Sequence, residues 1–479
     1  MVTGSLAAAT LVAVLAVYVW VGLRARTRGA GGDVEDYVVA RNSQSARMLG
    51  LSFLASGMGA WVLFAPPEVG ATVGAAAIVG YALGAAAPLA AFALLGRRMR
   101  AVVPAGHALT EWVRLRFGRA FHGWIVGVSI SYMLIFVTAE LTAIGGAAAL
   151  LSDLPPRLVI AAVAAATLAY TAYGGLRATL WTDRLQGWSI LALLTAAVVA
   201  ILTQQPDAVG PRVAGLRLVS GGGLQVALTL IIAVTVANLF HQGYWQRVWA
   251  ARDARALNRG AALGAITTMP VVAVCGLLGL VAAESGVILG DPPVPFFALL
   301  AGVPTWLTAV VFVLALSLVA SSVDTLENGL AALVAAERPP TGLRGARWAT
   351  VALMVPAVAV AVQGHSVLRL FLVADVLCAG AVVPALLSLW RRATAAGALA
   401  GAVAGLAGAV APGWLATGSL AQGVLLATFP GAVPTLPPFL GALLASALVA
   451  VGVSLAAGRA TDLEALAARV PILGRRAAR

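Results

Sequence analysis

The 479-residue chain lacks lysine altogether, and it has only two cysteines and 18 acidic residues. Its 31 basic residues are therefore all arginines, and charged residues make up 10% of the chain. This scarcity of charge, with 61% hydrophobic residues and a mean hydropathy of +0.96, excludes an ordinary soluble domain and indicates many membrane spans. The net charge of +13 does not predict a nucleic-acid partner, because the arginines cluster in short gaps between apolar runs.

The sequence also lacks metal-binding and catalytic motifs. Cys275 and Cys378 lie inside apolar spans, without the spacing of a metal or disulfide framework, so we expect both to pack in the interior. The chain contains no HExxH motif, no paired catalytic motif and no cofactor-binding loop. We therefore predict that the protein is not an enzyme and binds no organic cofactor.

Thirteen apolar stretches are long enough to cross a bilayer, whose hydrocarbon core of about 30 Å needs roughly 20 helical residues. They lie near residues 3–23, 46–72, 74–96, 120–150, 157–175, 185–204, 222–242, 259–284, 304–335, 346–363, 367–390, 393–412 and 436–458. No positive residue precedes the first stretch, whereas Arg24 and Arg26 follow it. This order predicts an uncleaved first helix and no signal peptide.

The arginines give these spans an orientation. If the loop after the first span lies inside and the sides then alternate, only Arg157, Arg212, Arg217 and Arg369 fall outside. So one-sided a distribution follows the positive-inside rule. We expect a multi-pass protein of the cell (inner) membrane, with its N-terminus outside and its C-terminus in the cytoplasm.

One span is interrupted. The stretch from Leu51 to Gly70 contains Gly57, Gly59 and then the pair Pro66-Pro67. In hydrocarbon every backbone polar group needs a partner, so a helix that breaks there must line a cavity, a neighbouring helix or a bound ion. The alternative is a kinked structural helix, because glycine and proline are common in membrane spans.

The span at 304–335 is unusually polar. Within two turns it contains Ser321, Ser322, Asp324, Thr325, Glu327 and Asn328. Ser321, Asp324 and Thr325 share one helix face through their i+3 and i+4 spacing. Such oxygens can replace the water shell of a hard cation such as Na⁺, although the hydroxyls could instead bond to helix carbonyls or join helices.

Four motifs, in this order, resemble the sodium:solute symporter family, which includes proline, pantothenate, sialic acid and sugar symporters. They are YTAYGGLRATLWTDRLQ from Tyr170, HQGYWQRVWAARDARALNRG from His241, ASSVDTLENGL from Ala320 and WRRATAAGALAGAVAG from Trp390. The resemblance extends from Asp36-Tyr37 to about Leu455.

The resemblance implies an all-α polytopic protein with the leucine-transporter fold, in which two inverted five-helix repeats each begin with a broken helix. Residues 1–45 would form an extra N-terminal helix and a cytoplasmic loop. Residues 46–204 and 205–390 would form the two repeats, and 391–479 two C-terminal helices and a cytoplasmic tail. The broken helix that begins the first repeat is then the interrupted stretch described above.

Carried over from the family, a Na⁺ site would use backbone carbonyls at Ala55, Met58 and Leu318 and the hydroxyls of Ser321 and Ser322. Sialic acid symporters also resemble this chain in a second cation site, whose positions align with Asp183, Ser321, Asp324 and Thr325. The family usually has a hydroxyl where Asp324 stands, so this carboxylate could tighten a second cation or hold a proton. Asp183 could instead cap its own helix.

Substrate contacts in the family come from core helices 1, 3, 6 and 10. This implies Trp61, Glu68, Glu140, His241, Gln242, Tyr244 and also Asp375 as candidates. Glu140 could be hydrogen-bonded between helices, or it could meet a cationic or amide-bearing substrate. The sequence around Gln242 and Tyr244 is also similar to urea and polyamine symporters of the family.

These features favour a Na⁺-coupled secondary active transporter that imports a small polar solute, such as an amino acid, a carboxylate or urea, by alternating access. A solute sensor of the same fold and a proton-coupled symporter are the alternatives. The expected partners are the solute and the lipid bilayer, and no nucleic acid.

Overall fold

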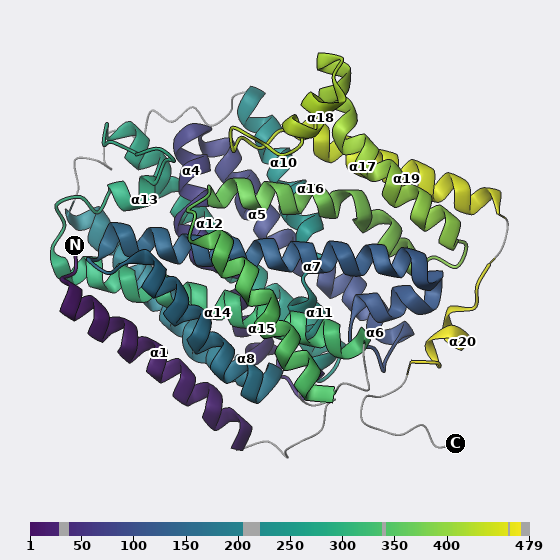
Figure 1. The fold of residues 1–479 in the computed structure, drawn as a ribbon, viewed down its shortest axis with the longest axis horizontal. Helices are drawn as coiled ribbons and strands as arrows, with labels where there is room; N and C mark the ends of the chain where they lie inside the picture. The colour runs from purple at the N-terminus through teal and green to yellow at the C-terminus, as the bar shows by residue number, and fades with distance from the viewer. Residues whose placement is uncertain (28–37, 205–220, 338–341, 458–459, 471–479) are drawn as a thin grey trace.

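The computed structural model (Figure 1) describes residues 1–27, 38–204, 221–337, 342–457 and 460–470, and in these ranges every regular element is a helix. Residues 205–220, the start of the family resemblance at Asp36-Tyr37 and the last nine residues of the tail lie outside the described residues. The helices are α1 (Gly4–Thr27), α3 (Ala46–Gly57), η1 (Ala60–Leu63), α4 (Ala65–Thr72), α5 (Ala75–Ala91), η2 (Phe92–Gly96), α6 (Arg97–Val102), α7 (Leu109–Leu151), α8 (Pro156–Gln204), α10 (Gly221–Asn238), α11 (Gln242–Ala250), α12 (Ala254–Glu284), α13 (Pro295–Ala298), α14 (Thr305–Glu337), α15 (Gly342–Ala361), α16 (Val367–Leu386), η5 (Leu387–Leu389), α17 (Ala395–Thr417), α18 (Leu420–Leu426), α19 (Leu436–Ala456) and α20 (Leu463–Ala467).

The protein has the helices of a polytopic membrane protein. In the described ranges nine helices are long and apolar enough to cross a membrane, and two bent helix pairs bring the number to 11. Each predicted span overlaps one of the helices, but 157–175 and 185–204 both fall in α8. The 49 residues of α8 would measure about 74 Å if straight, more than twice a bilayer core. They are divided at Gly175, whose φ of 59° favours glycine.

Both bent pairs occupy positions that the inverted-repeat expectation assigned to broken helices. Helix α3 ends at Gly57, and the chain resumes as η1 and α4 at an angle of 60°. Helices α10 and α11 meet at 63°. The first break lies at Met58 and Gly59, which have extended backbone, whereas Pro66 and Pro67 begin α4 in its first turn, where proline is well tolerated.

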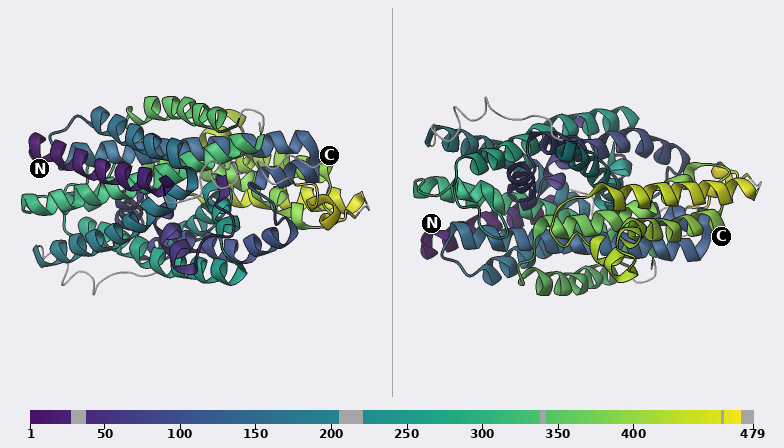
Figure 2. Two further views of the ribbon diagram at one scale, coloured as in Figure 1. Left: turned by 90° about the horizontal axis from the view of Figure 1, so that it is seen from below. Right: turned by 90° about the horizontal axis from the view of Figure 1, so that it is seen from above.

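Helix α14 is at the centre of the molecule. It packs against α7, α8, α3 and η1, and 78% of its most apolar stretch is buried, against 28% for α1 and α19. Helix α1 lies against α8 on one flank, and α17 and α19 pack together against α16 on the opposite flank (Figures 1 and 2). Helices outside the expected repeats therefore cover the periphery, and the polar helix α14 is enclosed by the rest.

Backbone hydrogen bonds tie the loops together at both ends of the bundle. The Val2 amide donates to the Leu151 carbonyl at 2.8 Å, so the N-terminus lies at the end of α7. At the other end the Gln44 amide donates to the Ala250 carbonyl at 2.9 Å. Arg116 also donates there, to the carbonyl of Ala393 at 2.6 Å. Arginines predicted to be cytoplasmic thus also fasten loops to one another.

Candidate functional site

The break in the first repeat faces the carboxylate of Glu140. This carboxylate, which projects from α7 and has no exposed surface, accepts a hydrogen bond from the Ala60 amide at 2.8 Å and another from the Ser322 hydroxyl at 2.9 Å. Glycine at position 59 makes this approach possible, because a Cβ there would collide with the carboxylate. Of the two sequence interpretations of Glu140, the structure has the carboxylate bridging helices.

The predicted ion ligands flank this junction. Helix α3 ends just after Ala55, whose carbonyl accepts a long 3.3 Å bond from the Met58 amide, as expected where a helix loses its regular partners. On α14, Ser322 bonds to Glu140, and Ser321 donates to Asp183 at 3.1 Å. The carbonyl-bearing end of α3 and the hydroxyl-bearing face of α14 therefore meet through shared polar partners.

A second buried cluster surrounds Asp183 on α8. Arg247 of α11 donates to the Asp183 carboxylate at 2.8 Å, and both side chains are fully buried. Ser52 donates to the same carboxylate at 2.5 Å and Ser56 at 3.2 Å, and both serines also accept bonds from the Arg247 guanidinium. Thr325 of α14 completes the cluster, since it accepts from Arg247 at 3.2 Å.

This cluster coincides with the predicted second cation site. Asp183, Ser321 and Thr325 converge there as expected, but the positive charge among them is the guanidinium of Arg247. Asp183 is not a helix cap, because α8 resumes directly after Gly175 and its side chain points into this cluster. A charge pair in a nonpolar interior needs such surrounding donors to offset the loss of hydration.

Asp324 and Glu327 of α14 bond to α8. Asp324 accepts from the Tyr170 hydroxyl at 2.6 Å and from Thr182 at 3.2 Å. Glu327 accepts from two further hydroxyls, of Thr167 at 2.9 Å and Thr171 at 2.7 Å. The hydroxyls of α8 therefore join the helices, as the alternative interpretation of serine and threonine in membrane spans proposes.

A small aromatic cavity adjoins the break, with Gly57 in its lining. It has a volume of about 40 Å³ and includes Trp61 and Asp375 among its walls. The Trp61 ring stacks on Tyr81, with centroids 5.6 Å apart, and meets Phe371 edge-on at 6.0 Å. The complete lining is Gly57, Trp61, Tyr81, Phe136, Val234, Asn238, Phe371 and Asp375.

Besides Glu68 and Glu140, three predicted substrate residues do not line this cavity. The Gln242 amide donates to the His107 carbonyl at 3.2 Å, toward the start of α7. His241 stacks on Tyr244 with centroids 4.4 Å apart, and the Tyr244 hydroxyl lies beneath Gly57. These side chains support the two breaks, whereas Trp61 and Asp375 line the cavity itself.

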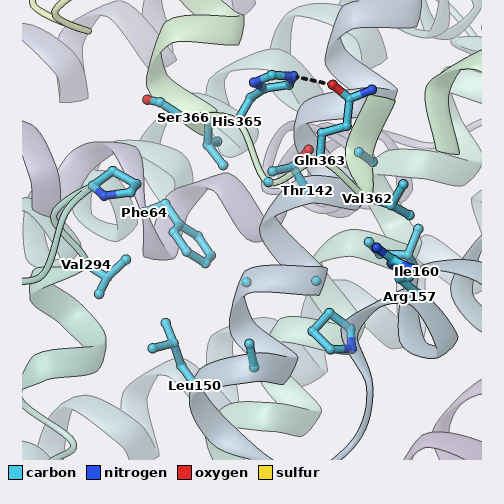
Figure 3. A pocket seen from close by; sticks show the side chains of 18 of the residues that line it. Phe64, Thr142, Leu150, Arg157, Ile160, Val294, Val362, Gln363, His365 and Ser366 are labelled. Atoms are coloured by element: carbon cyan, nitrogen blue, oxygen red, sulfur yellow. Dashed lines mark hydrogen bonds between the residues drawn. The ribbon is translucent and has the colours of Figure 1, made fainter. Parts of the chain in front are cut away.

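A larger outer pocket of about 360 Å³ has Glu68 among its lining residues. Figure 3 shows other side chains of this lining. The pocket is bounded by α4, the end of α7, the start of α8 and the chain around Val294. On its rim the His365 ring and the Gln363 side chain are 3.1 Å apart, joined by the dashed line in Figure 3. Glu68 thus lies one helix segment beyond Trp61, in a separate, more open space.

Several contributors to these sites were not predicted from the sequence. They are Ser52 and Ser56 in the cluster and Tyr81, Phe136 and Phe371 in the cavity. Two serines one turn apart before a helix break are a usable signal. Aromatic residues are also scarce, at 7% of the chain, so those within apolar spans carry information.

The chain is similar to several known transporters. No family model matches it. It is 29% identical over 359 residues to the spermidine transporter DUR31 of Candida albicans, covering 73% of this chain and 68% of that protein. It is 26% identical over 403 residues to the urea-proton symporter DUR3 of Oryza sativa subsp. japonica, covering 72% of this chain but 55% of that protein. The urea active transporter of Saccharomyces cerevisiae matches over 117 residues at 30% identity, covering 24% of this chain and 16% of that protein.

Solved structures share the fold. A Na⁺-coupled sialic acid symporter in a substrate-bound outward-open state matches with a TM-score of 0.75 at 14% identity, covering 95% of this chain and 98% of that one. The nucleobase-cation-symport-1 family transporter Mhp1 matches with a TM-score of 0.55 at 15% identity, covering 86% and 98%. The fold is therefore that of the leucine transporter, as expected. The chain is thus similar over most of its length to proteins named as transporters of spermidine and urea, and it shares the fold of a Na⁺-coupled symporter.

Proposed function

We propose that the protein is a Na⁺-coupled symporter that imports a small polar organic solute by alternating access. The observation that carries this proposal is the junction of the broken helix with α14, where the Ala60 amide, the Glu140 carboxylate and the Ser322 hydroxyl meet. Discontinuous helices at such a position are suited to ion and substrate binding in inverted-repeat transporters.

The ligands of the coupling Na⁺ would be the carbonyls of Ala55, Met58 and Leu318 and the hydroxyls of Ser321 and Ser322. The donor set suits the ion, because hard cations prefer oxygen ligands. Glu140, already hydrogen-bonded to Ser322, would supply a negative charge beside the ion. These ligands come from two helices, so binding the ion would hold α3 against α14.

The second cation predicted at Asp183, Asp324 and Thr325 would be replaced by Arg247. Its guanidinium bonds to Asp183 and Thr325 and carries the charge that a free ion would otherwise bring. We therefore propose one free coupling ion per transport cycle.

The solute would bind beside Trp61 at the break. Relatives are named for urea and for spermidine, which are both small, nitrogen-rich and polar. The solute would reach this point from the outer pocket around Glu68, since both spaces adjoin successive segments of the same broken helix.

A proton-coupled symporter is the second candidate. It is favoured by the buried carboxylate of Glu140 at the junction, a group that can carry a proton, and by the relative named as a urea-proton symporter. In that case Glu140 would bind the coupling proton, and the neighbouring hydroxyls would serve as its hydrogen-bond partners.

The 13-span topology and its orientation belong to this proposal. If α8 is counted as two spans and the short apolar helix within α15 as one, the described helices reach that number. The N-terminus and the outer pocket would then lie outside, and the arginine-rich loops would lie in the cytoplasm.

Uptake into proteoliposomes tests the proposal. Labelled urea and spermidine are supplied with an inward Na⁺ gradient, an inward proton gradient or neither. Accumulation that follows the Na⁺ gradient supports the first candidate, and accumulation that follows only the proton gradient supports the second. Solute binding without accumulation under any gradient would favour a sensor and overturn both.

A further inference from the structure

The aromatic cavity beside the break contains a carboxylate that lacks a hydrogen-bonding partner on one side. Asp375 of α16 is 3% exposed, and its Oδ1 atom forms no hydrogen bond within the part of the chain that the structure describes. Leaving a buried carboxyl oxygen without a hydrogen-bond donor is costly, and natural proteins rarely do so without a reason. The atom lies where the cavity could supply a ligand to pair with it.

The other walls of the cavity are mostly aromatic. The rings come from separate parts of the fold: Trp61 and Tyr81 from the first broken helix and α5, Phe136 from α7 and Phe371 from α16. The Phe136 and Phe371 rings pack edge-to-face with centroids 4.5 Å apart. Aromatic faces attract organic cations, most strongly where water is excluded.

The size of the cavity limits what it can hold. Its volume of about 40 Å³ exceeds the roughly 10–15 Å³ that a cavity needs in order to hold one water molecule. A group as small as an ammonium therefore fits. A longer solute would have to extend out of the cavity.

We propose that this cavity binds the ammonium group of an organic amine, with Asp375 as its counter-ion and the four aromatic rings as its walls. The inference rests on the proposed transport function and narrows its solute class to amines. A neutral solute such as urea can donate hydrogen bonds to Asp375, but it cannot neutralise a buried carboxylate.

A second carboxylate, that of Glu68, lies in the outer pocket. It therefore stands on the route that a longer amine would follow. A diamine seated on Asp375 would direct its second ammonium group toward that pocket.

Calorimetric titration of the purified full-length protein in detergent tests the proposal. The probes are 1,4-diaminobutane and its neutral counterpart of the same length, 1,4-butanediol. We expect the diamine to bind and the diol to bind about tenfold more weakly or not at all. Asp375→Asn should weaken diamine binding by about tenfold or more. Glu284→Gln, which removes a carboxylate at the end of α12, away from the cavity, should leave it unchanged.

A second variant guards against misfolding of the first. Phe371→Leu keeps an apolar wall but removes a ring face, and it should weaken diamine binding by about three- to thirtyfold. Equal binding of diol and diamine, or full diamine affinity in both variants, would overturn the amine assignment. The binding measurement needs no ion gradient. If uptake proves not to depend on Na⁺, the diamine-binding result therefore remains valid. If Na⁺ drives the uptake of neutral solutes but not of amines, the amine assignment is refuted, whereas the proposed transport function still holds.

Discussion

Arg247 of α11 donates from Nη2 to the Asp183 carboxylate of α8 at 2.8 Å, and neither side chain has exposed surface. The pair joins two elements 64 residues apart, and Ser52 and Ser56 bind both partners from α3. The two broken helices are thus held together through one fixed positive charge. The contribution of this pair to the stability of the protein can be measured.

Removal of either charge should destabilise the protein. Arg247→Gln leaves Asp183 buried without its partner, which costs about 3–5 kcal/mol in buried pairs of this kind. The double variant Asp183→Asn, Arg247→Gln should recover part of that loss, because no uncompensated charge remains. Unfolding in detergent, followed by tryptophan fluorescence, measures both.

The matched control for this prediction is Arg252→Gln. Arg252 forms an ion pair with Asp253 at 3.4 Å, but the two side chains are 68% and 50% exposed. We expect almost no change in its unfolding, because water and salt screen such pairs. A loss as large as that of Arg247→Gln would contradict the assigned role of burial.

Gly59→Ala should disrupt the junction. A Cβ at this position collides with the Glu140 carboxylate, so either the carboxylate or the break must move. Overpacking of this kind costs about 1–3 kcal/mol, and we expect ion-driven uptake to be lost. Gly123→Ala is the control, since a Cβ there meets nothing within 4 Å. Normal transport by Gly59→Ala would show that the Glu140 contact is dispensable.

Thr171→Val should destabilise the contact between α8 and α14. The variant keeps the shape of the side chain but removes a donor from the buried Glu327 carboxylate, to which Thr171 donates at 2.7 Å. An unsatisfied buried group costs about 1–3 kcal/mol. Thr195→Val, which loses only a bond to its own helix carbonyl of Leu191, should have little effect on the unfolding midpoint. Equal midpoints for the two variants would contradict this prediction.

Gln242 and Trp61 should respond differently to truncation. Gln242→Ala removes a bond to the His107 carbonyl, away from the cavity, so KM should stay within about twofold of the wild-type value. Trp61→Ala opens the cavity wall, and KM should rise by about tenfold or more. Solute uptake at several concentrations gives both values. If KM for Gln242→Ala changes by more than about twofold, Gln242 contacts the substrate after all.

Features that local sequence patterns determine are predictable from the amino-acid sequence alone. Glycine at 57 and 59 disrupts a helix within a few residues, and the polar face of α14 follows from i+3 and i+4 spacing. The sequence therefore predicts the broken helix of the first repeat, and it also predicts that Ser321, Asp324 and Thr325 share one helix face, where all three are buried.

The pairing of distant groups is not predictable in the same way. Ser322 and Glu140 are 182 residues apart, and the sequence leaves the role of Glu140 open. Arg247 stands in the sequence only as a charge near a helix end, and nothing local shows which carboxylate it meets. The proposed role of Asp375 depends on four aromatic rings from separate segments that line the same cavity. Such sites depend on how helices pack, and chain spacing carries no record of that packing.

The binding of Na⁺ at the junction is the central claim, and thermal unfolding of the purified protein in NaCl and in KCl at equal ionic strength tests it most directly. A ligand that binds only the folded state raises the unfolding temperature. Wild-type protein should unfold at a higher temperature in NaCl than in KCl, and Ser322→Ala should lose that difference. Identical unfolding of the wild type in both salts, or an undiminished Na⁺ effect in Ser322→Ala, would contradict the proposed site.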